Sequence, residues 1–177
     1  MALILDGTNG IDYPGGGGYQ NIALTAAGAQ ATTSGSAIDF TAIPAGTKRI
    51  TVALSGVSTN GSTDLIVQLG TSGGVQSSGY TGGFSQGNNA IVTSNMNTGF
   101  VVGNNGAAAS TTHALITLVN ITGSTWVMQG IGQRSDSTAY GFSSGSVSLS
   151  GVLDRVRLTT VGGTNTFDAG SANILYE

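Results

Sequence analysis

Serines in three glycine-rich segments are the residues of this chain that could act as nucleophiles. They lie in G-x-S-x-G patterns at Gly70–Gly74, Gly83–Gly87 and Gly141–Gly145. In hydrolases this pattern places the serine on a strained turn between a strand and a helix. No helical pattern follows any of the three segments, and a chain rich in Gly and Ser produces such matches by accident.

The single histidine does not complete a catalytic triad with these serines. His113 follows the first two patterns, but no Asp or Glu lies between Asp64 and Asp136 to supply the order serine, acid, histidine. Ser143, in the third pattern, comes after His113. The sequence therefore predicts that the protein is not an enzyme.

Residues that bind metals are also sparse. The chain has no cysteine and one histidine, so a zinc site is not expected. Oxygen ligands at Asp6–Asn9 and Asn165–Asp168 could hold calcium, but neither segment has EF-hand spacing and both are typical of Asx turns. No pair among the seven aspartates can be named for glycosidase chemistry, and Asp154 is expected to face neighbouring arginines. There is no Walker-type loop and no G-x-G-x-x-G pattern. No metal or cofactor is predicted, although calcium stays open.

Aromatic residues in glycine-rich loops are the candidate binding residues. Tyr80 and Phe84 lie in SSGYTGGFSQG, and Tyr140 and Phe142 lie in TAYGFSSG. Exposed rings can stack on the faces of sugars, while Ser, Asn and Gln nearby offer hydrogen bonds to hydroxyl groups. The alternative is that these rings fill the ends of a sandwich as core residues.

The composition favours a folded chain with an uncharged exterior. Charged residues make up 7% of the chain, against roughly 25% in ordinary globular proteins. Thirty of the 177 residues are glycine, but the hydrophobic share is 39% and falls in short alternating runs, unlike a disordered chain. We expect a β-protein with many turns and a surface of hydroxyls and amides.

Several classes of partner are excluded by charge and hydropathy. The net charge is −3, and five basic residues cannot form a face for nucleic acid. There is no run of 18 apolar residues, so no membrane insertion is expected. The chain starts without the basic and apolar regions of a signal peptide, and the lack of cysteine fits synthesis in a reducing cytosol.

Alternation of apolar residues predicts the strands. Ile50, Val52 and Leu54 alternate with polar or small residues, and the alternation resumes over residues 65–69. The corner at residues 58–62 contains Asn-Gly, which favours a hairpin turn. The sequence therefore predicts a hairpin here.

Two further hairpins and several single strands follow the same pattern. One hairpin is predicted at residues 113–121 and 124–133, and another at 139–150 and 152–160, with Val156 and Leu158 facing the core. Further strands are predicted at residues 22–31, where a short helix is the alternative, and at residues 37–42, 90–93, 100–103 and 171–176. About ten to twelve short strands at this spacing predict an all-β, antiparallel, jelly-roll-like β-sandwich. Four consecutive glycines at residues 15–18 divide the chain into an N-terminal arm, residues 1–21, and the sandwich domain, residues 22–177.

Long stretches of the sequence resemble a domain of tail-fibre and related virion proteins of tailed bacteriophages and prophages. The resemblance lies in SGVSTNGSTDLIVQLG (Ser55–Gly70) followed by GGVQSSGY (Gly73–Tyr80), and in LDRVRLTTVGGTNTFDAGSANILYE (Leu153–Glu177). The opening LDGTNGI (Leu5–Ile11) is similar to the start of many phage tail-fibre chains. The resemblance implies a virion location, with synthesis in the host cytoplasm, and identifies no catalytic residue.

The resemblance implies a non-enzymatic structural protein, foremost a homotrimeric tail-fibre or spike-type protein that binds a host receptor such as a surface glycan. A capsid decoration (cement) or head-fibre protein is the alternative, because only about twenty residues stand where long fibres have a stalk. A polysaccharide depolymerase is the third hypothesis.

Specific residues are assigned to assembly on this hypothesis. The arm is expected to anchor the oligomer to other virion proteins through Leu3, Leu5, Ile11 and Tyr13. Arg155 and Arg157, on one face of a strand, are expected to pair with Asp168 or the Glu177 carboxylates of a neighbouring subunit, or to be solvated.

Overall fold

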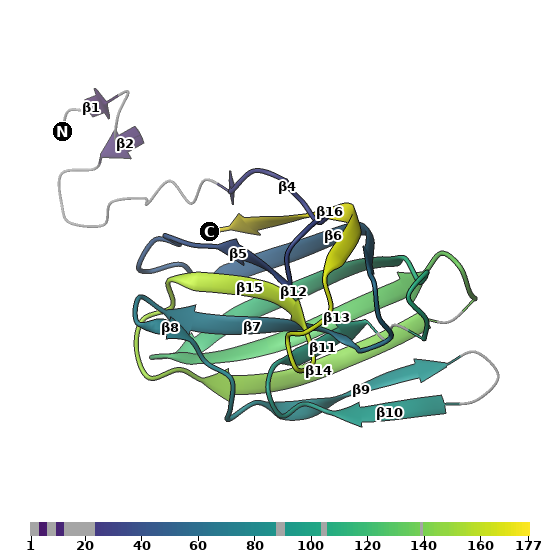
Figure 1. Cartoon of the computed structure of the whole chain (residues 1–177). Helices are drawn as coiled ribbons and strands as arrows, with labels where there is room; N and C mark the ends of the chain where they lie inside the picture. The colour runs from purple at the N-terminus through teal and green to yellow at the C-terminus, as the bar shows by residue number, and fades with distance from the viewer. Residues whose placement is uncertain (1–3, 7–9, 13–23, 88–90, 104–105, 139) are drawn as a thin grey trace.

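The protein is a β-sandwich of two antiparallel sheets packed face to face (Figure 1). The computed structural model describes residues 4–6, 10–12, 24–87, 91–103, 106–138 and 140–177, although not the side chains of residues 4–6, 10–12, 91, 92 and 94. Every regular element in these ranges is a strand. The prediction of an all-β sandwich is therefore confirmed.

The larger sheet has nine strands. Its order is β10 (Ile91–Asn95), β9 (Thr81–Gly87), β14 (Tyr140–Ser148), β13 (Thr125–Arg134), β12 (Thr112–Thr122), β6 (Arg49–Thr59), β16 (Phe167–Tyr176) and β3 (Thr25–Ala26), with β4 (Gln30–Ala31) also paired to β16. The predicted hairpin of β12 and β13 is confirmed, with Thr112 opposite Arg134 and Thr122 opposite Thr125.

The smaller sheet has five strands. Its order is β11 (Phe100–Gly103), β7 (Leu65–Thr71), β15 (Arg155–Thr160) and β5 (Ala37–Phe40), with β8 (Gly74–Val75) paired to β7. A separate two-stranded hairpin joins β1 (Ile4–Asp6) to β2 (Gly10–Asp12). The described residues thus contain sixteen strands, more than predicted, because several are only two residues long.

The core lies between the two sheets and follows the predicted alternation. Ile50, Val52 and Leu54 of β6 are buried, as are Val156 and Leu158 of β15. Burying an aliphatic side chain of this size contributes about 1.5–3 kcal/mol. The alternating positions of these two strands therefore hold the sheets together.

The predicted hairpin at residues 58–62 is wrong, because β6 and β7 belong to different sheets. The corner bonds to a distant segment: the amide of Asn60 donates to the carbonyl of Thr166, and the amide of Thr166 donates to Asn60 Oδ1, both at 2.9 Å. Residues 65–70 are all buried, as expected for a strand inside a sheet. The chain crosses from one sheet to the other here.

The predicted third hairpin is wrong for the same reason. β14 lies in the nine-stranded sheet and β15 in the five-stranded sheet. The connection between them carries the buried side chains of Leu149 and Leu153. The hydroxyl of Ser124 donates to the carbonyl of Leu149 at 2.7 Å and fixes the start of the crossing.

Glycines on the inner face of β13 and β14 allow close packing. A Cβ atom on Gly132 would lie 2.8 Å from the carbonyl oxygen of Val102 in β11, and one on Gly141 would lie 2.5 Å from the ring of Phe84. Real Cβ atoms do not approach other atoms this closely. The glycines therefore make room for a strand of the facing sheet and for an aromatic ring.

Candidate binding site and interaction face

Two of the four predicted binding aromatics belong to the core. Tyr80 and Phe84 are 4% and 2% exposed. The ring of Tyr80 packs edge-on against Phe100, with centroids 4.9 Å apart, and Phe84 lies over Gly141. The structure thus places both rings in the core, as the alternative interpretation had it, and Gly141 leaves the space that the ring of Phe84 fills.

The hydroxyl of Tyr80 is hydrogen-bonded to the backbone of Leu69 and of Gln76 inside the protein. The amide of Leu69 donates to Tyr80 Oη at 2.7 Å, and the hydroxyl donates to the carbonyl of Gln76 at 3.0 Å. Burial raises the pKa of Tyr80 to about 12, although the hydrogen bond from Leu69 acts in the opposite direction. Tyr80 therefore holds the loop that begins at Gln76 against β7.

The other two aromatics lie on the surface, on the outer face of the nine-stranded sheet. Tyr140 and Phe142 are 51% and 54% exposed, and their rings meet edge to face with centroids 5.6 Å apart. Phe142 is opposite Ile131 on β13, and Ile131 is opposite Leu115 on β12. Ile131 and Leu115 are also more than half exposed. We call Leu115, Ile131, Phe142 and Tyr140 the apolar ladder.

The immediate neighbours of the apolar ladder on this face are uncharged. Gln129 and Ser144 lie two residues from Ile131 and Phe142 along their strands, and both are exposed. Gln133 is opposite Tyr140 and His113 is opposite Gln133. The amide of Gly56 donates to His113 Nδ1 at 3.3 Å, which fixes that ring at the end of the face. The ladder is thus an apolar row within a neutral polar surface.

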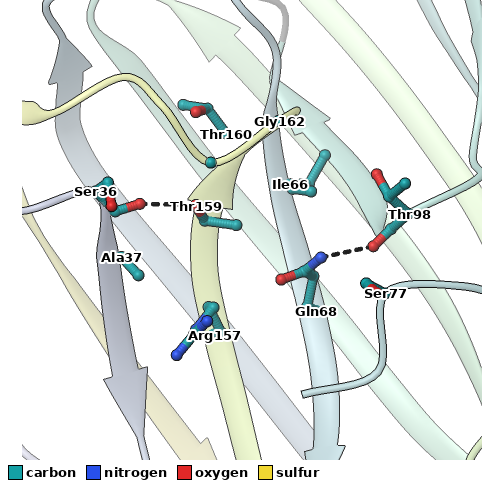
Figure 2. Close-up of a pocket in the computed structure, with 11 residues that line it drawn as sticks. Ser36, Ala37, Ile66, Gln68, Ser77, Thr98, Arg157, Thr159, Thr160 and Gly162 are labelled. Carbon is teal, nitrogen blue, oxygen red and sulfur yellow. Dashed lines mark hydrogen bonds between the residues drawn. The ribbon is translucent and has the colours of Figure 1, made fainter. Parts of the chain in front are cut away.

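A polar pocket lies on the opposite side of the sandwich, on the outer face of the five-stranded sheet. Its volume is about 310 Å³. Figure 2 shows its floor, formed by side chains of β7 and β15, and its rim, formed by separate loops. The polar residues that line it are Ser36, Gln68, Ser77, Thr98, Arg157, Thr159 and Thr160. We call this the polar pocket.

Hydrogen bonds tie the floor of the polar pocket to its rim (Figure 2). Gln68 Nε2 donates to the carbonyl of Thr98 at 2.7 Å, and the hydroxyl of Thr159 donates to the carbonyl of Ser36 at 2.7 Å. Two segments that are far apart in the sequence are thereby held against the two strands of the floor.

The arginine of the polar pocket is held by an aspartate of the same chain. Arg157 Nε and Nη2 each donate to a carboxylate oxygen of Asp39 at 2.7 Å. Hydrogen bonding to Asp39 raises the pKa of Arg157. Arg157 is opposite Asp39 in the register of β15 and β5, so the pair follows from strand pairing.

Most of the residues predicted to make subunit contacts form salt bridges within their own chain. Arg155 donates to Asp154 and to the carbonyl of Ser72, each at 3.2 Å. The Glu177 side chain is paired with Arg49. Asp168 is exposed and forms no salt bridge within the described ranges. Both arginines are therefore already paired before any subunit approaches. The expectation that Asp154 faces a neighbouring arginine is confirmed, whereas the pairing of Arg157 with Asp39 was not predicted.

The predicted anchoring residues fall in the arm. Leu3 and Tyr13 lie outside the described residues, and Leu5 is opposite Ile11 in the β1–β2 hairpin. Asp6 begins the segment Asp6–Asn9, which was considered for calcium, and the other residues of that segment, 7–9, also lie outside the residues that the structure describes. Among the residues described, no three His, Cys, Asp or Glu side chains group to hold a metal. In the same ranges no helix could span a membrane.

Comparison of the chain with protein-family models, with curated proteins and with solved structures found no match.

Proposed function

We propose that this chain is a non-enzymatic structural protein of a bacteriophage virion, and that it works there as an oligomeric receptor-binding subunit of the tail-fibre or spike type. The resemblance of its first strands and its C-terminal segment to tail-fibre domains supports the virion location. The apolar ladder is the observation that carries the oligomeric role.

The apolar ladder has the properties of a protein contact face. Four large apolar side chains stand together, each at least half exposed, and covering the exposed part of each would contribute about 1 kcal/mol. Neutral neighbours mean that identical copies do not repel each other there. A symmetric oligomer, expected from the resemblance to be a trimer, would bury one ladder per copy.

The arrangement of the candidate nucleophiles supports a role without catalysis. Ser143 is buried, and its hydroxyl lies 3.5 Å from the carbonyl of Gly130. His113 bonds to the amide of Gly56 on the neighbouring strand. Ser72 and Ser85 are exposed and lie on the five-stranded and nine-stranded sides respectively. The hydrogen bonds of His113 and Ser143 therefore go to other groups, and within the described structure no serine of the three patterns is paired with His113 as nucleophile and base.

Ile131→Ser with Phe142→Ser in one chain tests the oligomeric role. Light scattering after gel filtration should give an oligomer for the unmodified protein and a monomer for the double variant, because two rungs of the ladder lose their apolar contact. Gln129→Ser with Gln133→Ser, on the same face, is the control and should stay oligomeric. An unmodified protein that is monomeric at tens of micromolar would contradict the proposal.

The virion location is tested by immunogold labelling of phage particles with an antibody to the purified protein. Label on the tail is expected. Label confined to the head would replace the tail-fibre role by capsid decoration. Particles without label would contradict a virion role altogether.

A further inference from the structure

We propose that the polar pocket binds one uncharged sugar residue of a surface polysaccharide. The source of that sugar rests on the proposed receptor-binding function, whereas the binding itself rests on the pocket alone. The observations that carry the inference are the size of the pocket, the chemistry of its lining and the fixed positions of its side chains.

The size of the pocket suits a small ligand. Its volume of about 310 Å³ is at the lower end of the range of roughly 300–1,000 Å³ that is usual for ligand sites. It is open to solvent on the outer face of the sheet, so a single ring could enter while the rest of a chain stayed outside. A terminal or branching sugar fits this geometry better than an extended stretch of polymer.

The lining offers hydrogen-bond donors and hydrogen-bond acceptors close to one another. Hydroxyl groups of serine and threonine donate and accept, as sugar hydroxyls do. Because Gln68 Nε2 is engaged by Thr98, the amide oxygen of Gln68 is left as an acceptor, and in Figure 2 it points toward the side of the pocket where Arg157 and Thr159 lie. The Thr159 hydroxyl donates to Ser36, which leaves its oxygen lone pairs as acceptors.

The electrostatics favour an uncharged ligand. Arg157 is the one charged residue among those that line the pocket in the described chain, and Asp39 neutralises it through two hydrogen bonds of 2.7 Å. An anion would have to compete with Asp39, and a cation would find no carboxylate in the lining. In the part of the chain that the structure describes, Ala37 and Ile66 supply the apolar side chains of the lining, so an apolar ligand would leave the polar groups unpaired.

The polar side chains are held in place before any ligand arrives. Gln68 and Thr159 are bonded to the rim, and Gln68 is 8% exposed. The loop that carries Ser77 is fixed at Gln76, whose carbonyl accepts from Tyr80 and whose side-chain amide donates to the carbonyl of Ser148 at 3.0 Å. Binding therefore requires little ordering of the protein. Among the described residues, no aromatic ring lines the pocket, so affinity for one sugar is expected on the order of 1 mM.

Saturation-transfer NMR with the full-length protein tests the proposal. The probes are the methyl glycosides of glucose, galactose, mannose, rhamnose and N-acetylglucosamine, with glucuronic acid and sialic acid as charged comparators. At least one uncharged probe is expected to bind at millimolar concentration. Failure of all uncharged probes, or binding by the charged comparators alone, would overturn the proposal.

Two variants locate the binding. Ser77→Trp places a large ring at an exposed rim position and should block the pocket without disturbing the core. Gln68→Leu removes the floor amide and should weaken binding at least tenfold. Gln129→Ser, at an exposed position on the other sheet, is the control and should bind as the unmodified protein does. Binding that survives Ser77→Trp would overturn the assignment even if Gln68→Leu failed to fold.

The outcomes separate this inference from the proposed function. A virion protein that binds none of the uncharged sugars would overturn the inference and leave the proposed function standing. The opposite result is also informative. If the protein binds sugar through Ser77 and Gln68 but is absent from phage particles, the inference stands and the proposed function is overturned.

Discussion

The hydroxyl of Tyr80 links two segments of the chain through a buried hydrogen-bond pair. It accepts from Leu69 on β7 and donates to Gln76 at the start of the loop over that strand. Because the hydroxyl is almost completely buried, its ionised form is disfavoured in the folded protein. This one atom therefore connects the packing of the core to the rim of the polar pocket.

Alkaline unfolding should reveal this buried hydroxyl. The pKa of Tyr80 is about 12 in the folded protein and about 10 in an unfolded chain. The raised folded-state pKa contributes stability that is fully present below pH 10 and is lost between pH 10 and 12, at about 1.4 kcal/mol per pH unit. Urea unfolding measured across this range checks the expectation.

Tyr80→Phe is the comparison for that experiment. The variant should be less stable at neutral pH by about 1–3 kcal/mol, because the amide of Leu69 loses its partner. Its stability should fall less steeply between pH 10 and 12 than that of the unmodified protein. Equal slopes for the two proteins would show that the hydroxyl is not held in its neutral form by burial.

At the scale of the strands, glycine decides how closely the elements of the sandwich pack. Gly132 faces the backbone of β11 from the other sheet, and Gly141 lies under the ring of Phe84 from the neighbouring strand. Part of the high glycine content therefore has a packing role, in addition to its role in turns.

Gly141→Ala should destabilise the protein by about 1–3 kcal/mol, the usual cost of overpacking a core. The added Cβ would lie 2.5 Å from the Phe84 ring, so the ring would have to move. Gly73→Ala is the control, because the nearest atom to its Cβ would be 3.5 Å away, and it should change stability by less than about 0.5 kcal/mol. Thermal unfolding of both variants measures the difference, and a neutral Gly141→Ala would show that the ring has space to shift.

The strands were predictable from the sequence, and so was the pairing of β12 with β13, but the other two predicted pairings were wrong. Alternation is a local property, so the inward faces of β6 and β15 could be read from residues such as Ile50 and Val156. The crossing after β6 depends on Asn60 bonding to Thr166, more than a hundred residues away, and the Asn-Gly step looks the same in a hairpin and in a crossing. Long-range contacts of this kind leave no local pattern.

The candidate site was predictable only in part for the same reason. The polar pocket draws Ser36, Gln68, Thr98 and Arg157 from four separate segments, and only the folded sheets bring them together. Gln68 and Arg157 did carry a signal, because each is a polar residue at an outward position of a strand. Tyr80 lies in a glycine-rich loop pattern like that of Tyr140, and the sequence does not say which of the two rings is buried.

For the whole molecule, the low charge predicts how association depends on salt. The apolar ladder has neutral neighbours, so contact through it should not be screened by ions. The proposed oligomer is therefore expected to persist between 50 mM and 1 M NaCl, and to become more stable in sulfate, which strengthens apolar burial. Sedimentation velocity at each salt concentration measures this, and dissociation at high salt would point to a contact made by ion pairs.

The two outer faces of the sandwich point in opposite directions, with the apolar ladder on one and the polar pocket on the other. Copies joined through their ladders would therefore turn every pocket toward the periphery, where several could engage one repetitive surface at once. Linked weak sites of this kind can gain a factor of roughly 10²–10⁴ in avidity. If the proposed function holds, a Kd of about 1 mM per copy would then suffice for attachment, while each individual contact could still dissociate quickly.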